Sequence, residues 1–302
     1  MISSILSLYT LSIINLNIGR INTLDFTPAA INSFLQSSQQ ISTEDSIPIK
    51  NPENIGPVLG AKSVISIDLK SGITLYEKNA HARLPIASIT KLMTILIILE
   101  ENNLDDMVEV SKNATKTGGA LMFLTAGEKI TVENLLYGAL IPSANDAAVA
   151  LAEFNAGDTT KFVTKMNEKA SQLGLLNTHF SNPIGLDEAG NYSSAYDISK
   201  LARYIYQKKF IRETAILKEK KVKSIDGKIT HELKSTDELL GSYLKIKGLK
   251  TGTTDKAGQC LVSIAENDNG NTIIDVLLDS PARFTESKIL IDWVFRAYNW
   301  KN

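Results

Sequence analysis

The stretch "YLKIKGLKTGTTDKAGQCLVSIAENDNGNTIIDVLLD", residues 243–279, predicts three consecutive strands. Its runs "YLKIKGLKTG", "GQCLVSIAE" and "NTIIDVLLD" are rich in strand-forming residues, and the turn-forming segments "TTDKA" and "NDNG" separate them. Further upstream, "AKSVISIDL" (61–69) and "ITLYEKN" (73–79) flank a Lys-Ser-Gly turn and predict a β-hairpin. We therefore expect one antiparallel sheet assembled from both ends of the folded chain.

The residues between these strand groups predict helices. Residues 88–101, "SITKLMTILIILEE", are apolar on nearly every side, which indicates a helix buried inside a domain. Helical patterns also cover 131–141, 145–154, 159–174, 195–207 and, at the C-terminal end, 283–299. This order predicts an α+β fold in which terminal helices flank the sheet and an all-helical subdomain is inserted at about 88–215.

The composition excludes several classes of function. The chain has 302 residues, a net charge of −1 and no basic run with interleaved aromatics, so we expect no nucleic-acid partner. Cys260 is the single cysteine, which rules out an intrachain disulfide framework. His81, His179 and His231 lack metal-ligand spacing, so no metal site is expected. A Ser-His-Asp triad stays open, because its members meet only in space.

The N-terminal region differs from the rest of the chain. Residues 1–19 carry no charge and many Ile and Leu, which predicts a signal peptide or a single membrane anchor. Residues 20–57 are rich in Ser, Gln, Asn, Thr and Pro and predict a flexible linker. We expect the folded catalytic domain to span residues 58–302, with no second, β-rich domain after it.

The buried helix carries a candidate nucleophile. Ser88 and Lys91 form an S-x-x-K motif, whose hydroxyl and amine share one helix face. A serine hydroxyl needs a base, and a lysine becomes one when burial and a nearby cation lower its pKa. The competing interpretation is a surface lysine on an ordinary helix, which the apolar surroundings disfavour.

Two later triplets complete a possible site. Ser143-Ala144-Asn145 lies between apolar helices, where Ser143 could relay a proton and Asn145 could bind a substrate amide. Either residue could also cap a helix, and both roles can hold together. Lys250-Thr251-Gly252 and Thr253 end a strand pattern, where a glycine lets a peptide approach the sheet edge and the hydroxyls can bind a carboxylate. A solvated strand end would explain that triplet equally well.

Earlier copies of both triplets occur in "VSKNATKTGGA", residues 110–120. They are too close together to lie on opposite walls of a cleft, and we see no strand pattern between them and the helix at 131. We interpret this stretch as a loop and short helix with a turn at Gly118-Gly119, outside the chemistry.

Taken together, the motifs give the chain a family resemblance. The order S-x-x-K, S-x-N, K-T-G and the segments "LYEKNAHARLPIASITKLMT", "LTAGEKITVENLLYGALIPSANDAA", "FSNPIGLDEAGNYSSAYDISKLAR" and "GLKTGTTDKAGQCLV" resemble the serine D-alanyl-D-alanine carboxypeptidases, which are low-molecular-mass penicillin-binding proteins. The resemblance covers about residues 58–298 and implies a β-lactamase-like fold with a five-stranded antiparallel sheet.

The resemblance also implies a mechanism and a setting. Ser88 would attack the bond between two D-alanines of a peptidoglycan stem peptide, with Lys91 as base and without a cofactor. Ser143 and Lys250 would share proton transfer, Asn145 would hold the substrate, and the N–H groups of Ser88 and Thr253 would form the oxyanion hole. Arg283 matches a family position that helps bind the substrate carboxylate. β-Lactams would be covalent inhibitors, and the location would be the bacterial envelope, either outside the cytoplasmic membrane or secreted.

Two departures keep alternatives open. Asn191-Tyr192-Ser193 stands where many relatives have His-Tyr-Ser, and the chain ends soon after the last predicted helix, as in short DD-endopeptidases that cut crosslinks. A serine β-lactamase needs a deacylating acid, and Glu188 is the nearest one that we find. A non-catalytic sensor of peptidoglycan or β-lactams is disfavoured by the intact Ser88, Lys91, Ser143 and Lys250.

Overall fold

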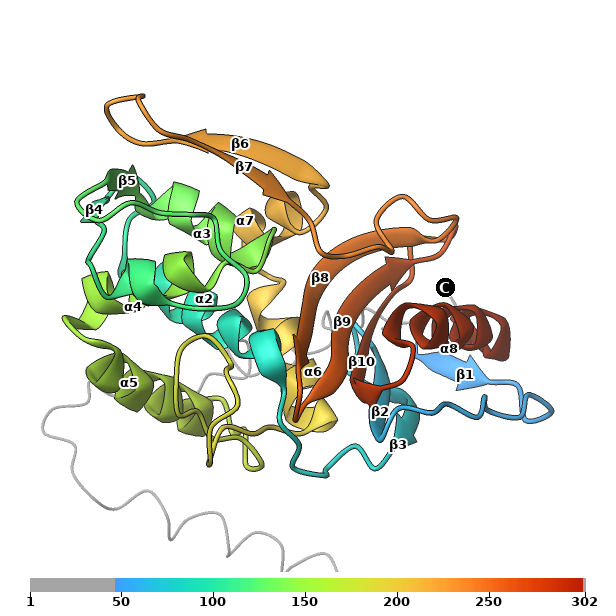
Figure 1. Ribbon diagram of the computed structural model, residues 1–302. Helices are drawn as coiled ribbons and strands as arrows, with labels where there is room; N and C mark the ends of the chain where they lie inside the picture. The colour runs from blue at the N-terminus through green and yellow to red at the C-terminus, as the bar shows by residue number, and fades with distance from the viewer. Residues whose placement is uncertain (1–46, 301–302) are drawn as a thin grey trace, which may run out of the picture. The chain divides into compact units, whose positions relative to one another are not determined.

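The computed structural model describes residues 47–300, which fold around a five-stranded sheet (Figure 1). The strands follow the order β3-β2-β10-β9-β8, and every neighbouring pair is antiparallel. They are β2 (Ser63–Asp68), β3 (Thr74–Lys78), β8 (Lys245–Thr254), β9 (Gly258–Glu266) and β10 (Thr272–Ser280). The predicted hairpin is β2–β3, and the predicted run of three strands is β8–β9–β10, so the α+β class is confirmed.

Successive residues of a strand point to opposite faces of the sheet, and in this sheet both faces are covered. Ile65 and Val276 belong to the core shared with the helical part, whereas Val64 and Leu277 belong to a second core with the C-terminal helix. That helix, α8 (Arg283–Ala297), is the expected terminal helix. The other face is covered instead by α6 (Ala195–Ile205), which comes from the inserted segment.

The inserted segment packs around one central helix. All of the first eight residues of α2 (Lys91–Glu101) are buried, as the all-round apolar pattern predicted. Around it lie α3 (Val132–Leu140), α4 (Asn145–Ala156) and α5 (Thr159–Gln172), and α7 (Lys209–Thr214) follows α6. The predicted cap at Thr131 is confirmed, because its hydroxyl accepts a hydrogen bond from the Asn134 amide.

Three two-stranded pairs were not expected from the sequence. They are β1 (Pro48–Lys50) with β11 (Tyr298–Trp300), β4 (Met107–Glu109) with β5 (Lys129–Thr131), and β6 (Glu219–Lys223) with β7 (Thr230–Lys234). The prediction of a linker up to residue 57 is therefore wrong at its C-terminal end, because β1 pairs with the last described strand. Likewise, β5 is a strand between the early triplets and α3, where none was expected.

Residues 1–46 lie outside the described residues, and with them the predicted leader or anchor at 1–19 and most of the predicted linker. Within residues 47–300, none of the helices has both the length and the apolar character that crossing a membrane requires.

Candidate active site

Ser88 lies on a short turn of 3-10 helix, η1 (Ala87–Thr90), directly before α2. The α-helix therefore begins at Lys91, three residues later than the sequence predicted. The residue before the serine, Ala87, has φ of 48°, a left-handed conformation that is unusual for a residue with a side chain. Such strained backbone often occurs at functional sites, and here it presents Ser88 as a half-buried residue between buried neighbours.

Lys91 is fully buried and contacts the serine directly. Its Nζ lies 2.8 Å from Ser88 Oγ and donates to the carbonyl of Ile184 at 3.0 Å. Burial, and next the positive charge of Lys250, hold the pKa of Lys91 well below its usual range, while Asp146 acts in the opposite direction. A neutral amine at hydrogen-bond distance can accept the serine proton, which the ordinary ammonium form cannot do.

Ser143 and Asn145 lie where α3 turns into α4. Ser143 has φ of 64°, and its buried Oγ has no hydrogen-bond partner among the described residues. Asn145 donates from Nδ2 to the carbonyl of Gly118 at 2.7 Å, and its Oδ1 likewise lacks a partner within residues 47–300. Neither side chain caps α4, so the capping interpretation is wrong. Both polar atoms are thus available to a bound molecule.

Strand β8 supplies the opposite wall. It is an edge strand of the sheet, paired with β9 only. A Cβ at Gly252 would lie 2.9 Å from the backbone nitrogen of Ser88, so the glycine allows β8 and η1 to touch. Lys250 is buried, and burial together with the nearby Arg283 lowers the pKa of its amine to about 7. Its Nζ donates to the Thr251 carbonyl at 2.9 Å.

Arg283, the first residue of α8, reaches over the end of this strand. Its Nη1 donates to the carbonyl of Gly252 at 2.8 Å and to the hydroxyl of Thr253. Its Nε is buried without a partner among the described residues. The guanidinium therefore brings a positive charge and a spare donor to the end of the β8 wall.

These elements enclose one cleft of about 230 Å³. Seven of the nine predicted site residues line it, while Lys91 and Lys250 are buried outside its wall. Its lining consists of Ser88, Gly119, Ala120, Ser143, Asn145, Ile184, Gly185, Leu186, Thr236, Thr251, Gly252, Thr253, Thr254 and Arg283. The three motifs, far apart in the sequence, thus converge on one serine.

One part of the lining, the loop 182–188, was missed by sequence reasoning. Asn182 holds the loop in shape, since its Oδ1 accepts from the amides of Gly185 and Leu186 and thereby places the Ile184 carbonyl at Lys91. Asp187 ties the loop to β8 through the hydroxyl of Thr254. The only available signal was "NPIG", a turn pattern that does not reveal its partner.

Glu188, the acid considered for deacylation, belongs to the same loop. Its carboxylate accepts from the Asn182 side chain at 3.0 Å, and it is absent from the lining of the cleft. The loop residues that do face the cleft are Ile184, Gly185 and Leu186, none of which is a proton acceptor by its side chain. Therefore this loop presents no general base to the serine.

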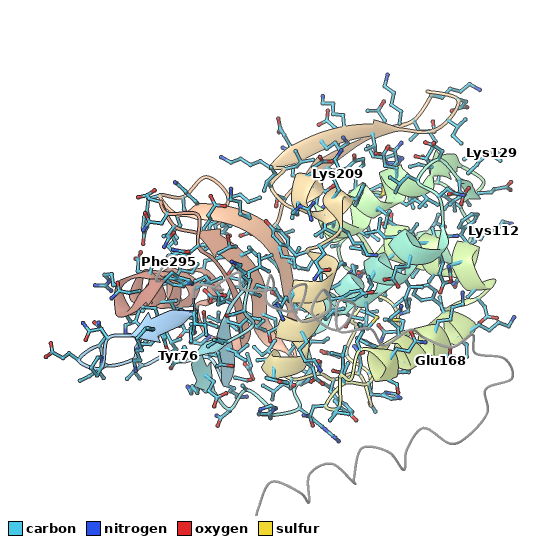
Figure 2. All side chains as sticks on the ribbon, turned by 180° about the vertical axis from the view of Figure 1, so that it is seen from behind. Tyr76, Lys112, Lys129, Glu168, Lys209 and Phe295 are labelled. Carbon is cyan, nitrogen blue, oxygen red and sulfur yellow. The ribbon has the colours of Figure 1, made fainter. Side chains whose placement is uncertain are left out.

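The early triplets in residues 110–120 take no part through their side chains. Lys112 is exposed at the outside of the helical part (Figure 2), and residues 114–116 form the expected short helix. The backbone that follows nevertheless holds Asn145 in place. The Gly118 carbonyl accepts from the Asn145 side chain, and the Ala120 carbonyl accepts from the Asn145 backbone amide. Asp146, also unforeseen, fixes the same segment by accepting from the amides of Met122 and Leu124.

The histidines lie away from this cleft. None of them is in its lining, and His231 instead forms a buried pair with Glu128, with 2.7 Å between Nε2 and Oε1. Since Ser88 Oγ contacts Lys91, the arrangement is a serine–lysine pair and not a Ser-His-Asp triad. Within residues 47–300, no group of three or more metal-ligating side chains gathers in one place.

Comparison with known proteins identifies the family of this chain. The family model described as D-alanyl-D-alanine carboxypeptidase, peptidase family S11, matches residues 50–282. The chain belongs to this family. Its match starts at the end of β1, which agrees with a folded domain that begins before residue 58.

Individual relatives in the D-alanyl-D-alanine carboxypeptidase family agree with this. The chain is 39% identical over 246 residues to D-alanyl-D-alanine carboxypeptidase DacF of Bacillus subtilis, covering 79% of this chain and 63% of that protein. It is 35% identical over 292 residues to DacA of Escherichia coli strain K12, covering 92% and 70%. The chain thus spans about two thirds of the length of these relatives.

The solved structures include a relative of similar size. The crystal structure of the Streptomyces K15 DD-transpeptidase matches with a TM-score of 0.76 and 33% identity, covering 80% of this chain and 99% of that one. Penicillin-binding protein 6B of Escherichia coli matches with a TM-score of 0.72 and 32% identity, covering 81% of each chain. These likenesses confirm the DD-peptidase fold.

Proposed function

We propose that this chain is a serine-type D-alanyl-D-alanine carboxypeptidase that removes the terminal D-Ala from peptidoglycan stem peptides. The observation that carries the proposal is the 2.8 Å contact between Ser88 Oγ and the buried amine of Lys91, at a cleft whose other wall is an open strand edge. Family membership supports the substrate, since the relatives are named for D-alanyl-D-alanine.

In the acylation step, Lys91 takes the Ser88 proton while Oγ attacks the carbonyl between the two D-alanines. The oxyanion then accepts from the amides of Ser88 and Thr253. The backbone at Gly252 passes so near the Ser88 nitrogen that an added Cβ would lie 2.9 Å from it, which supports this pairing. The amine of the departing D-Ala receives a proton through Ser143, whose Oγ is available. Water, activated by the same lysine, then hydrolyses the ester and restores Ser88.

The substrate peptide would lie along β8 as an added strand. An edge strand offers free backbone groups to an extended peptide, and Asn145 faces it with an unpaired Oδ1 and an Nδ2 donor. The terminal carboxylate would bind the hydroxyls of Thr251 and Thr253 and the charges of Lys250 and Arg283. Such placement accounts for the Thr251 and Thr253 hydroxyls and the Arg283 guanidinium in the lining of the cleft, while the Lys250 charge acts from a buried position outside that lining.

The same cleft would react with β-lactams, which mimic the acyl donor and would acylate Ser88. A fast β-lactamase would need a base for deacylation, and Glu188 is held by Asn182 away from the cleft lining. The intact set of Ser88, Lys91, Ser143 and Lys250 disfavours a non-catalytic sensor. A DD-endopeptidase uses the same groups, so these residues do not separate the two peptidase activities.

The test compares labelled penicillin with a D-Ala-D-Ala pentapeptide. A long-lived adduct together with D-Ala release supports the carboxypeptidase, and Ser88→Ala should lose both reactions. Rapid penicillin turnover would favour the β-lactamase, whereas an adduct without peptide cleavage would favour the sensor. Crosslinked and uncrosslinked muropeptides, offered at equal concentration, separate the endopeptidase from the carboxypeptidase.

We infer that the protein works in the bacterial envelope, on the outer face of the cytoplasmic membrane or after secretion. The support is chemical, because peptidoglycan stem peptides are crosslinked outside that membrane. The apolar residues 1–19 would act as signal or anchor. Fractionation of cells that produce the tagged full chain checks this; recovery in the cytosol alone would contradict it.

A further inference from the structure

Asp237 is a carboxylate near the site that the proposed chemistry leaves unused. It lies in the loop between β7 and β8, which is fixed to the strand because the hydroxyls of Thr236 and Thr251 hydrogen-bond to each other. Asp237 Oδ1 accepts from the amide of Leu239 at 2.9 Å. Its Oδ2 is buried and has no hydrogen-bond partner within residues 47–300. A buried carboxylate oxygen without a partner is rare and calls for an explanation.

A small cavity joins this carboxylate to Lys250. The cavity has a volume of about 10 Å³ and is separate from the substrate cleft. Its walls are formed by Leu140, Ile141, Thr214, Ala215, Leu217, Ser235, Thr236, Asp237, Leu249, Lys250 and Thr251. A volume of roughly 10–15 Å³ with polar partners holds one water molecule. An ammonium has three donors, and Lys250 Nζ uses one on the Thr251 carbonyl, so it can donate towards this cavity.

The charged groups around Lys250 indicate a role for the Asp237 carboxylate. Arg283 of α8 is a cation whose charge lowers the pKa of Lys250, and the charge of Lys250 in turn lowers the pKa of Lys91 in α2. Asp237 is the acid that raises the pKa of Lys250. Reciprocally, Lys250 and Arg283 oppose the rise that burial causes in the pKa of Asp237, while the exposed Glu238 adds to it. Asp146 acts on Lys91 and not on Lys250.

We propose that Asp237 is a positioning residue of the active site, which holds the Lys250 ammonium charged and in place through one water molecule in this small cavity. The two lysines must differ in charge, since Lys91 accepts a proton while Lys250 attracts the substrate carboxylate. Asp237 shares the cavity with Lys250 and not with Lys91, so its negative charge stabilises the protonated form of Lys250. The inference rests on the proposed function, but it concerns the protonation of one side chain and can fail separately.

The experiment is the pH profile of acylation by a fluorescent penicillin, measured as a second-order rate constant between pH 5 and pH 10. Asp237→Asn keeps the shape and removes the charge. An opposite charge nearby shifts a pKa by about 1 unit or more, so we expect the basic limb of the Asp237→Asn profile to lie about one pH unit lower than that of the unaltered chain. At pH values above the basic limbs of both profiles, the variant should acylate about tenfold more slowly than the unaltered chain. Below the limb the rate should stay within about twofold. Lys91 and Lys250 interact, so the pH of the basic limb is a property of both lysines together. The informative quantity is therefore the difference in that pH between the variant and the unaltered chain.

Glu238→Gln is the matched control, since it removes an exposed acid from the adjacent position. Its profile should overlay that of the unaltered chain. Asp237→Ser, a smaller neutral variant, should reproduce the shift if Asp237→Asn does not fold. An unshifted basic limb in a folded Asp237 variant, or an equal rate loss at every pH, would overturn the proposal. Absence of D-Ala release by the unaltered chain would instead reject the proposed function.

Discussion

At the scale of single residues, the candidate site buries an amine away from bulk water. Lys91 is buried on all sides, and its hydrogen bonds go to one hydroxyl and one carbonyl. Neither acceptor carries a charge, so the environment favours the neutral amine over the ammonium. The same burial that suits Lys91 to the proposed role of base therefore works against the stability of the folded chain.

The first prediction follows from this conflict. Lys91→Met keeps the length of the side chain and removes the buried polar group, so the free energy of unfolding should rise by about 1–2 kcal/mol at pH 7. Acylation by penicillin should fall at least about 10³-fold, since Ser88 loses its base. Urea unfolding and the adduct assay measure the two effects. A variant that is less stable than the unaltered chain would contradict this account of Lys91.

The second prediction concerns Lys250, whose pKa is depressed to about 7. As pH rises through this value the ammonium loses its charge, so the rate of acylation should fall well before an ordinary lysine titrates. Lys250→Arg carries a cation that stays protonated at every working pH. Its rate should be lower at pH 6 but should show no basic limb up to pH 10. A limb that persists at the same pH in the arginine variant would assign it to another group.

At the scale of elements, the proposed oxyanion hole requires β8 to lie close to η1. Gly252 provides this contact, because a Cβ there would lie 2.9 Å from the Ser88 nitrogen and 3.1 Å from the Ile86 carbonyl. Both neighbours are backbone atoms, which cannot rotate away as a side chain could. A larger residue must therefore move the strand or the turn, and with it the two amides proposed for the oxyanion hole.

Gly252→Ala should lower the rate of acylation by about 10²-fold, which is the typical loss when one oxyanion donor is misplaced. Gly118→Ala is the matched control, because a Cβ at Gly118 meets nothing within 4 Å. Rates of adduct formation and melting temperatures of both variants are the measurement. If Gly252→Ala acylates as fast as the control, the close approach of β8 has no catalytic role.

The elements also show how far sequence reasoning reaches. Long periodic segments such as α2 and β10 were predicted because burial leaves a clear apolar pattern. The residues of the three motifs were singled out because their types and order are unusual, and the fold brings them into or beside one cleft. Strand pairs of three residues, such as β1 with β11, leave no such pattern, because their pairing depends on residues about 250 positions apart. The contact of Asp237 with the cavity was equally invisible, since only the fold brings it near Lys250.

At the scale of the whole molecule, the central sheet contains a further buried acid. Asp275 lies in the middle of β10, between β2 and β9, and both of its carboxylate oxygens are buried without a hydrogen-bond partner among the described residues. Burial raises its pKa to about 7, an effect that the neighbouring Ser66 hydroxyl partly offsets. The fold therefore holds this side chain in its neutral form more readily than the unfolded chain does.

The last prediction follows from that difference. Between about pH 4 and pH 7 the folded chain keeps the Asp275 proton while the unfolded chain releases it, so this group makes stability fall as pH rises through that window and adds no further slope above it. The slope should approach about 1.4 kcal/mol per pH unit. Asp275→Asn should remove it, whereas Asp255→Asn, at an exposed position of the β8–β9 turn, should not. Urea unfolding at pH 5, 6, 7 and 8 gives the three curves. If the Asp275→Asn curve runs parallel to that of the unaltered chain, Asp275 is already charged in the folded state, and a hydrated path must reach the middle of the sheet.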